Sequence, residues 1–122
     1  MPNCGWYAIA YTEQNYQQVA NVYPDIPIVI TEAGWTTQSN GRGIEVHQAN
    51  TVNQARYYQD LVAWSQEHDV LTFVFEAFDE PWKGSHEHNE PEKHWGLFYV
   101  DRTPKPVLES MFTSPLSAAI TR

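Results

Sequence analysis

Residues 27–37 read PIVITEAGWTT, and the apolar run in this stretch ends on a single carboxylate, Glu32. Residues 26–31 are apolar or β-branched without alternation, which predicts a strand of a parallel sheet that is covered on both faces. Gly34 follows and allows a tight exit from that strand. The stretch therefore predicts a buried strand whose carboxyl end carries a charged side chain and, at Trp35, a large aromatic one.

A second apolar run, residues 70–78 (VLTFVFEAF), predicts a second buried strand by the same argument. It carries one carboxylate of its own, Glu76. The residues that follow it include further charged and aromatic side chains: Asp79, Glu80, Trp82 and Lys83. Both predicted strands thus end in the same way, with carboxylates and a tryptophan.

Helices are predicted before, between and after the two strands, over residues 12–22, 50–68 and 107–112. The middle helix has the clearest pattern, with Asn50 or Thr51 as its N-cap. Its predicted stripe at three- and four-residue spacing consists of Val52, Ala55, Tyr58, Leu61, Val62 and Ser65. Residues 95–100, WGLFYV, predict a short extended segment after a long polar loop.

This order of elements predicts an α/β fold with a βαβ unit and a parallel sheet. Two apolar strands by themselves leave sheet edges whose backbone groups are unpaired. The pattern therefore indicates one part of a larger architecture. Association with copies of the same chain would be one way to cover the open edges.

The carboxyl ends of parallel strands meet at a common crevice or barrel mouth. The side chains expected on this one rim are Glu32, Trp35, Glu76, Asp79, Glu80, Trp82 and Lys83. Glycosidases use two carboxyl groups, one as acid/base and one as nucleophile or base. Aromatic faces such as those of Trp35 and Trp82 can hold sugar rings. The alternative reading of a glutamate at a strand end is an ordinary loop residue or salt-bridge partner.

The composition and net charge of the chain limit the classes of molecule that it is expected to bind. The 122 residues are enough for one domain of ordinary size, and their formal net charge is −8. This balance argues against nucleic acids and anionic membrane surfaces as partners. Cys4 is the single cysteine, so an internal disulfide is excluded. No apolar run is long enough to span a membrane, and residues 1–14 do not have the pattern of a signal peptide.

Three linked motifs resemble glycoside hydrolase family 17, the β-1,3-glucanases and β-1,3-glucan transglycosylases. ITEAGWTT is similar to the family's TE-[AST]-G-W-P-[ST] segment, and FVFEAFDEPWK to its F-x-x-F-[DN]-E-x-x-K segment. EKHWGLFYVDRTPKP is similar to its E-x-[HY]-[FW]-G-L-[FY] segment. The resemblance covers roughly residues 10–110, with the order and spacing of the motifs retained.

The resemblance implies roles for individual residues. Glu32 matches the catalytic nucleophile. The other matching or neighbouring cleft residues, expected to bind substrate, are Trp35, Glu80, Trp82, Lys83, Glu92 and Trp95. For Lys83, an ordinary surface lysine is an equally open reading. Thr36 departs from the family, which commonly has proline there. No cofactor and no metal are implied.

The resemblance also implies a partial fold. Family members are (β/α)8 barrels, and residues 1–122 match only the C-terminal portion, roughly strands 7 and 8 with flanking helices, without a separate second domain. The acid/base glutamate, which follows the fourth strand in the family, has no match here. We therefore expect the 122 residues by themselves to be weakly active or inactive on β-1,3-glucan. Full-length relatives are often secreted, periplasmic or bound to the cell envelope, but the sequence leaves the localisation open.

Two other functions stay open at this point. The first is a non-catalytic carbohydrate-binding remnant, in which Trp35, Trp82, Trp95 and Tyr99 stack on sugars without turnover. The second is metal binding by residues 86–90, whose HxH spacing is able to chelate a metal ion. A solvated acidic loop is the simpler reading of that segment.

Overall fold

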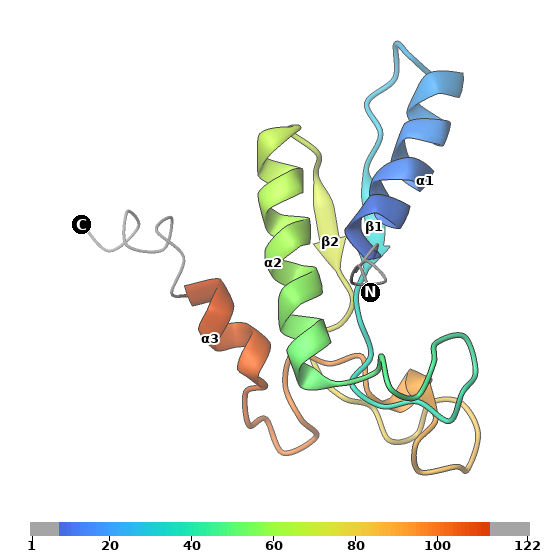
Figure 1. The fold of residues 1–122 in the computed structure, drawn as a ribbon, viewed down its shortest axis with the longest axis vertical. Helices are drawn as coiled ribbons and strands as arrows, with labels where there is room; N and C mark the ends of the chain where they lie inside the picture. Colours follow the sequence, from blue (N-terminus) through green and yellow to red (C-terminus); the bar gives the residue numbers. More distant parts are fainter. Residues whose placement is uncertain (1–7, 113–122) are drawn as a thin grey trace, which may run out of the picture.

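The computed structural model of the protein describes residues 8–112, and Cys4 lies outside them (Figure 1). The elements, in chain order, are α1 Ala8–Val22, β1 Ile30–Ala33, α2 Thr51–Glu67, β2 Thr72–Val74, the short 3-10 helix η1 Pro91–Lys93 and α3 Pro106–Phe112. Within these residues no helix is both long and apolar enough to cross a membrane.

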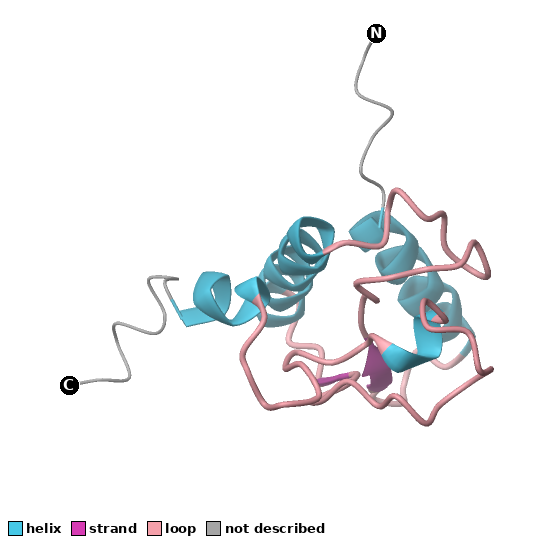
Figure 2. Ribbon diagram, turned by 90° about the horizontal axis from the view of Figure 1, so that it is seen from below, coloured by secondary structure: helices cyan, strands magenta, loops and turns pink. Residues whose placement is uncertain are grey.

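The two strands form a parallel pair, as the sequence predicts, with Ile30 opposite Thr72 and Ala33 opposite Val74. Together with α2 they make the predicted βαβ unit. Figure 2 shows α1 and α2 on the same side of this small sheet. Figure 1 shows the long loops gathered beyond the carboxyl ends of the strands, at what we call the loop end of the molecule.

The strands differ from the prediction in length and burial. β1 begins at Ile30 rather than at residue 26, and β2 covers Thr72–Val74 rather than residues 70–78. The expected cover on both faces is wrong for the described chain, because Val29, Leu71 and Phe73 are exposed. The ladder is short because each strand has one neighbour among residues 8–112. The side chains are exposed because a strand is buried only where another element packs over its face of the sheet.

Helix α2 begins where the sequence predicts, since the Asn50 side chain accepts a hydrogen bond from the Asn53 backbone N–H at 2.8 Å. The predicted buried stripe is wrong in part, because Val52 is 74% exposed and Gln54 is fully buried. The buried residues of the helix are Gln54, Tyr57, Tyr58, Leu61 and Trp64. Gln54 occupies a buried position because its amide donates to the backbone carbonyls of Trp35 and Gly96, each at 3.0 Å.

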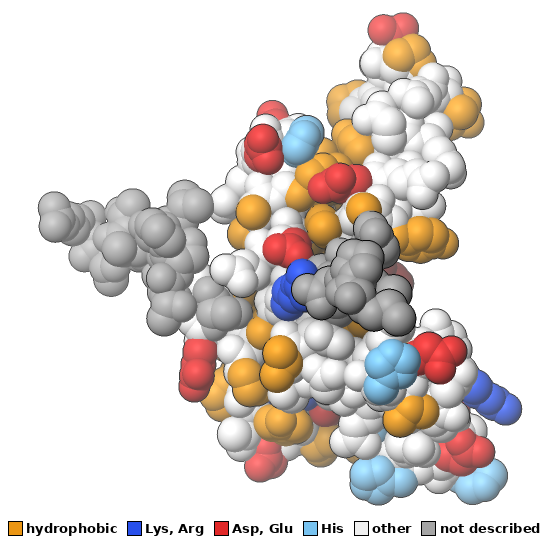
Figure 3. Space-filling view, viewed as in Figure 1, with side chains coloured by type: hydrophobic (Ala, Val, Ile, Leu, Met, Phe, Trp, Pro, Cys, Tyr) orange, Lys and Arg blue, Asp and Glu red, His pale blue; other side chains and the backbone are white. Residues whose placement is uncertain are grey.

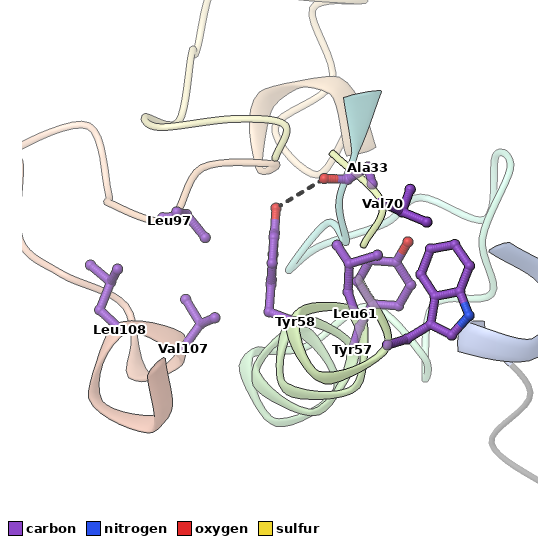
Figure 4. Close-up of a cluster of buried hydrophobic side chains, with 9 residues drawn as sticks. Ala33, Tyr57, Tyr58, Leu61, Val70, Leu97, Val107 and Leu108 are labelled. Carbon is purple, nitrogen blue, oxygen red and sulfur yellow. Dashed lines mark hydrogen bonds between the residues drawn. The ribbon is translucent and has the colours of Figure 1, made fainter. Parts of the chain in front are cut away.

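The core forms between α2, the strand ends and α3, as Figure 4 shows. Leu61 and Tyr58 of α2 face Ala33 of β1 and Val70, which precedes β2, and Val107 of α3 lies beside Tyr58. The Tyr58 hydroxyl lies 2.9 Å from the carbonyl oxygen of Phe75 and 3.5 Å from that of Ala33. Burial raises the pKa of the Tyr58 hydroxyl. Through its two contacts, this hydroxyl ties the exits of both strands to α2.

Beyond β2 the chain forms isolated β-bridges rather than a further strand. Phe78 forms a parallel bridge with Phe98, and Phe98 forms an antiparallel bridge with Pro104. The predicted extended segment at residues 95–100 is therefore confirmed around Phe98. The peptide bond between Phe75 and Glu76 is cis. The bridge between Phe78 and Phe98 brings residues 75–80 and 92–98 together at the loop end, beside the exit of β1.

Candidate functional site

Glu32 is the third residue of β1, and its side chain is exposed to solvent. Gly34 follows directly after β1 and lies beside the backbone of Phe75, the residue after β2. A Cβ atom on Gly34 would stand 1.8 Å from the carbonyl oxygen of Phe75 and 3.1 Å from the Tyr58 hydroxyl. The tight exit expected at Gly34 therefore has a tertiary cause, which is the backbone of the neighbouring strand.

We expect Gly34→Ala to lower the free energy of unfolding by about 3 kcal/mol, because the added methyl group must push the strands apart. The hydrogen bond from Phe75 N–H to the Ala33 carbonyl, 2.8 Å long, lies in the path of that movement. Urea denaturation measures the effect. Gly43→Ala is the matched control. No atom lies within 4 Å of a Cβ there, so only the backbone cost at φ 75° is expected, about 1 kcal/mol. Equal costs at the two positions would contradict the steric argument.

A cleft of about 1180 Å³ opens at the loop end between α1, β1 and α2. Four of the seven residues predicted for the site line it: Glu32, Trp35, Glu92 and Trp95. The sides of both tryptophans pack on other rings, Trp35 on Tyr57 at 5.5 Å and Trp95 on Phe75 at 6.1 Å between centroids. The cleft thus brings two carboxylates and two braced indole rings into one space.

Further polar residues of the cleft lie outside the three motifs, and all of them except Gln48, which is in the turn before α2, are on helices. These are Thr12, Asn15, Gln48, Arg56 and Tyr57. Thr12 and Tyr57 share a hydrogen bond of 2.9 Å between their hydroxyls. Burial raises the pKa of Tyr57, and the bond to Thr12 opposes this rise. Tyr57 is therefore a neutral hydroxyl on the wall of the cleft.

Glu80 and Lys83 do not line this cleft, but form a charged cluster beside it with Glu76. Lys83 Nζ lies 2.8 Å from Glu76 Oε2 and forms a second, shorter ion pair with Glu80. Lys83 Nζ also stands 4.8 Å from the centroid of the Phe75 ring, which lines the cleft. The cluster is thus linked to the cleft through Phe75. Glu76 is absent from the residues predicted for the site, although a carboxylate inside an apolar run is the signal for it.

The charges in this cluster depend on one another. Burial raises the pKa of Glu76, and the hydrogen bond from Lys83 opposes that rise. The hydrogen bond from Lys83 lowers the pKa of Glu80. The pKa of Lys83 is raised by its hydrogen bonds to Glu76 and Glu80, so the lysine remains charged at neutral pH. Lys83 is therefore an ion-pair partner of two carboxylates, with its side chain 30% exposed, and its role in the site stays a prediction.

A second charged pair, Asp79 with Lys105, is buried under the loop end and is not predicted by the sequence. Lys105 Nζ lies 2.7 Å from Asp79 Oδ1, and their side chains are 0% and 4% exposed. Lys105 Nζ also lies 3.0 Å from Thr37 Oγ1 and 3.3 Å from the His94 carbonyl. Asp79 Oδ1 also accepts from the Gly96 N–H at 2.9 Å. The pair therefore connects the loop after β1 with the segment that carries Trp95.

Thr36 and Thr37, which follow β1, strengthen this connection between the loop after β1 and the segment that carries Trp95. The fully buried Thr36 hydroxyl lies 2.9 Å from the Pro91 carbonyl and 3.0 Å from that of Gln38. The Thr37 N–H donates to the His94 carbonyl at 3.0 Å. Thr36, which replaces the proline common in the similar family, therefore supplies a buried hydrogen bond to the segment before Trp95.

Acid titration is expected to expose the contribution of Asp79 to stability. Burial by itself would raise the pKa of this carboxyl, but contact with His94 and the bond from Lys105 outweigh burial and hold the pKa below its usual value. A lowered pKa in the folded state means that the ionised form stabilises the fold. The stabilisation is present above the unfolded-state pKa of about 3.9 and is lost as the pH falls below it.

Asp79→Asn is therefore expected to lower the free energy of unfolding at pH 7 and to cost progressively less below about pH 4. Urea denaturation at pH 7 and pH 3 measures the difference. Asp25→Asn is the control, because it makes the same exchange at an exposed position. If Asp79→Asn lowers the free energy of unfolding equally at both pH values, the result contradicts the stabilisation of the fold by the ionised Asp79 carboxylate.

The remaining predicted residues lie apart from the cleft. Trp82 is 71% exposed and does not line the cleft, so its role in binding stays a prediction. Histidine side chains gather mostly at the loop end (Figure 3). Within residues 8–112, however, no group of three His, Cys, Asp or Glu side chains is arranged to hold a metal ion. His94 instead contacts the His88 carbonyl at 2.8 Å.

Comparison with known proteins places these features in a family. Residues 6–96 match the BtgE/BtgC glycoside hydrolase domain. A glucan 1,3-beta-glucosidase of Arthroderma benhamiae is 38% identical over 86 residues, which are 64% of this chain and 26% of that protein. A glucan 1,3-beta-glucosidase of Candida albicans is 31% identical over 96 residues, 78% of this chain and 30% of that protein.

Solved structures agree with the sequence matches. An endo-laminarinase from Formosa superposes with a TM-score of 0.69 at 33% identity, over 93% of this chain and 28% of that chain. A family 17 beta-1,3-glucanosyltransferase from Rhizomucor miehei superposes with a TM-score of 0.68 at 28% identity, over 80% and 34%. The chain thus spans about a quarter to a third of the length of these relatives. By motif, sequence match and fold, the chain belongs to glycoside hydrolase family 17, through its BtgE/BtgC glycoside hydrolase domain.

Proposed function

We propose that this chain supplies the nucleophile side of a retaining β-1,3-glucan active site, with Glu32 as the nucleophile. The observation that carries the proposal is the place of Glu32 at the carboxyl end of β1, in the same cleft as Trp35, Glu92 and Trp95. Family membership supports it, and one similar Rhizomucor miehei glucanosyltransferase is described in complex with laminaritriose. The substrate of this chain is, in our proposal, a β-1,3-glucan.

The proposed reaction has two steps. A Glu32 carboxylate oxygen forms a bond to the anomeric carbon, while the bond from that carbon to the leaving oxygen breaks. The leaving oxygen keeps the electron pair and receives a proton from a second carboxylic acid. Water or a sugar hydroxyl then attacks the glycosyl-enzyme, which gives hydrolysis or transfer, respectively. The second group acts as base in this step.

The second carboxylic acid must stand about 5–5.5 Å from the nucleophile in a retaining enzyme. We infer that it comes from a part of the barrel outside these 122 residues, because the only glutamate that precedes Glu32 is Glu13, on helix α1. Without it, loss of acid catalysis costs about 10²–10⁴-fold in rate. The 122 residues by themselves are therefore weakly active or inactive in this proposal.

The proposal includes a fold, a (β/α)8 barrel of which β1 and β2 are strands 7 and 8. The exposed apolar side chains of Val29, Leu71 and Phe73 support it, because neighbouring strands and side chains of a closed barrel would cover such groups. The chain covers only part of the length of its solved relatives, which agrees with a partial barrel. Association of two copies of this chain is a second way to cover the same surfaces, which sedimentation of the purified chain would detect.

The cluster of Glu76, Glu80 and Lys83 has an electrostatic part in the proposal. Lys83 neutralises one of two carboxylates close to Phe75 and the cleft. It thereby limits the negative potential on this side of the cleft. Glu92 and the two tryptophans of the cleft are assigned to substrate binding.

A second candidate function is binding of glucan without turnover. The two braced indole rings of the cleft favour it, because aromatic faces can hold sugar rings in the absence of an acid/base. Under this reading Glu32 contributes nothing essential. Binding of laminari-oligosaccharides would continue unchanged in Glu32→Gln, and no product would form.

A covalent trap separates the two functions. A laminaribioside with a 2-fluoro substituent and a dinitrophenolate leaving group needs no proton donor to react, so it tests the nucleophile by itself. We expect mass spectrometry to find the glycosyl adduct on the peptide that contains Glu32. Glu32→Gln should remain unlabelled, while Glu67→Gln, which changes an exposed glutamate at the end of α2, should be labelled like the unmodified chain. An adduct on Glu92 or Glu80 would refute the assignment of Glu32, and binding without any adduct would select the second candidate.

A further inference from the structure

The loop after β1, residues 38–44, lies beside the loop of residues 84–90 at the loop end (Figure 1). A side-chain hydrogen bond joins the two loops, because Asn40 Nδ2 donates to Glu87 Oε2 at 2.5 Å. The first loop also borders the cleft. Gly41 lines a cavity of about 640 Å³ whose wall shares both cleft tryptophans with the larger cleft. The Asn40 side chain therefore joins two loops at the rim of the cleft.

Asn40 is the one asparagine of the sequence that is followed by glycine. The backbone nitrogen of the next residue is the nucleophile nearest to the side-chain amide carbon of an asparagine, and a next residue without a Cβ atom leaves the approach open. Gly41 has φ 94°, and no atom lies within 4 Å of a Cβ placed there. The surroundings thus leave room for Asn40 and Gly41 to close a ring.

Hydrogen bonds hold each of the three groups that react when such a ring forms. The attacking group is the Gly41 N–H, which donates to Ser39 Oγ at 2.9 Å. The carbonyl oxygen under attack, Asn40 Oδ1, accepts from the Arg42 N–H at 3.1 Å, a donor that stabilises negative charge developing on this oxygen. The leaving nitrogen contacts the Glu87 carboxylate, whose charge stabilises the protonated form in which that nitrogen departs.

We propose that Asn40 is a site of spontaneous deamidation in the folded protein, with the Gly41 nitrogen as nucleophile and water as the co-reactant. The Gly41 nitrogen forms a bond to Asn40 Cγ, and the bond from Cγ to Nδ2 breaks. The proton of the Gly41 N–H passes to the departing nitrogen, which leaves as ammonia. Water then opens the resulting succinimide at either of its carbonyl groups, which gives aspartate or isoaspartate.

Both products break the contact between the two loops. Each places a carboxylate where the Asn40 Nδ2 donor stood, opposite the carboxylate of Glu87. A hydrogen bond is thereby replaced by repulsion between like charges. Isoaspartate also inserts an extra carbon atom into the backbone of the loop. The modification therefore loosens the loop that borders the cleft.

Peptide mapping by mass spectrometry, after incubation of the folded chain at mildly alkaline pH, tests the reaction. We expect Asn40 to convert at least about tenfold faster than Asn89, an exposed asparagine of the neighbouring loop, which equals about 1.4 kcal/mol in activation free energy. Glu87→Gln keeps an acceptor for Nδ2 but removes the charge, and should slow the conversion of Asn40 about fivefold. Glu67→Gln, at an exposed position on α2, is the matched control and should leave the rate unchanged.

Hydrogen exchange followed by NMR tests the consequence for the loops. The variant Asn40→Asp reproduces one product, and the N–H groups of Gly41 and Glu87, which donate to serine hydroxyls within their own loops, should exchange about tenfold faster in it. Asn89→Asp, the same exchange in the neighbouring loop, should leave both rates unchanged. The double variant Asn40→Asp, Glu87→Gln exchanges donor and acceptor and should restore slow exchange. Thermal unfolding checks that each variant retains the fold.

Several results would overturn the proposal. Equal conversion of Asn40 and Asn89, or conversion of Asn40 only in urea, would refute a deamidation site in the folded protein. A rate at Asn40 that Glu87→Gln leaves unchanged would refute the assistance by Glu87. Unchanged exchange in Asn40→Asp would refute the loosening of the loops. None of these results depends on glucan binding, so they are independent of the proposed function.

Discussion

Glu32→Gln is expected to reduce laminarin cleavage or transfer by a protein that carries this chain in a complete barrel by about 10⁴-fold or more, because loss of the proposed nucleophile removes the covalent route. The amide is nearly isosteric with the carboxylate but cannot attack the anomeric carbon. Release of reducing ends measures hydrolysis, and chromatography of oligosaccharide products measures transfer. The thermal midpoint should hardly change, since Glu32 is exposed.

The matched control for this change is Glu67→Gln, which should retain full activity. A nucleophile has a further signature that a merely structural glutamate lacks. In Glu32→Ala, added azide should restore turnover of an activated glucoside by attacking in place of the missing carboxylate, and the product should have the inverted anomeric configuration. Retention of more than a tenth of the activity in Glu32→Gln would contradict the assignment.

Lys105→Met is expected to lower the free energy of unfolding by about 3–5 kcal/mol, because it leaves the Asp79 carboxylate buried without its cation. Thr37 and the His94 carbonyl also lose a hydrogen-bond donor. The charge of Lys105 is itself costly, since burial lowers its pKa and the bond to Asp79 offsets part of that effect. Urea denaturation at pH 7 measures the loss.

Two comparisons separate the buried pair from a general effect of removing lysine. Lys83→Met makes the same exchange at a side chain that is 30% exposed, where a partly solvated ion pair contributes about 1 kcal/mol or less. In the double variant Asp79→Asn, Lys105→Met, the penalties should fall short of their sum by about 1–3 kcal/mol, because the second change removes the uncompensated charge. Strictly additive penalties would show that the two side chains do not interact.

The position of the buried pair also matters for function. It fixes the loop after Glu32 against the segment that carries Trp95, so loss of the pair is expected to disturb the cleft even though neither side chain lines it. A position of this kind, at the turn before α3, has no local signal in the sequence. Lys105 stands between two prolines, a context that by itself indicates an exposed turn.

Sequence patterns predicted the elements that depend on local chemistry. The N-cap at Asn50, the order of strands and helices, and the parallel pairing are confirmed. The family motifs also singled out Glu32, Trp35, Glu92 and Trp95, which line one cleft, whereas Glu80, Trp82 and Lys83, which the strand-end rule placed on the same rim as Glu32, do not line it. The roles of the cleft residues in catalysis and binding are proposals that the covalent trap and the binding of laminari-oligosaccharides address.

Features that depend on distant partners were predicted less well. The ends of both strands and the buried stripe of α2 differ from expectation, because ladder length and burial are set by which neighbours are present. Gln54 is the clearest example. A polar residue is predicted to face solvent, yet it is buried because two loop carbonyls lie within reach of its amide.

The sequence by itself determined the kind of protein this is. Local propensity, strand-end carboxylates and three linked motifs suffice for an α/β unit of family 17, since each acts over a few residues or through a fixed order along the chain. Only the tertiary structure decided the neighbours of Gly34, Glu76 and Asp79. Those contacts join residues far apart in the chain, and their strength depends on burial and distance, which exist only once the strands and loops have packed together.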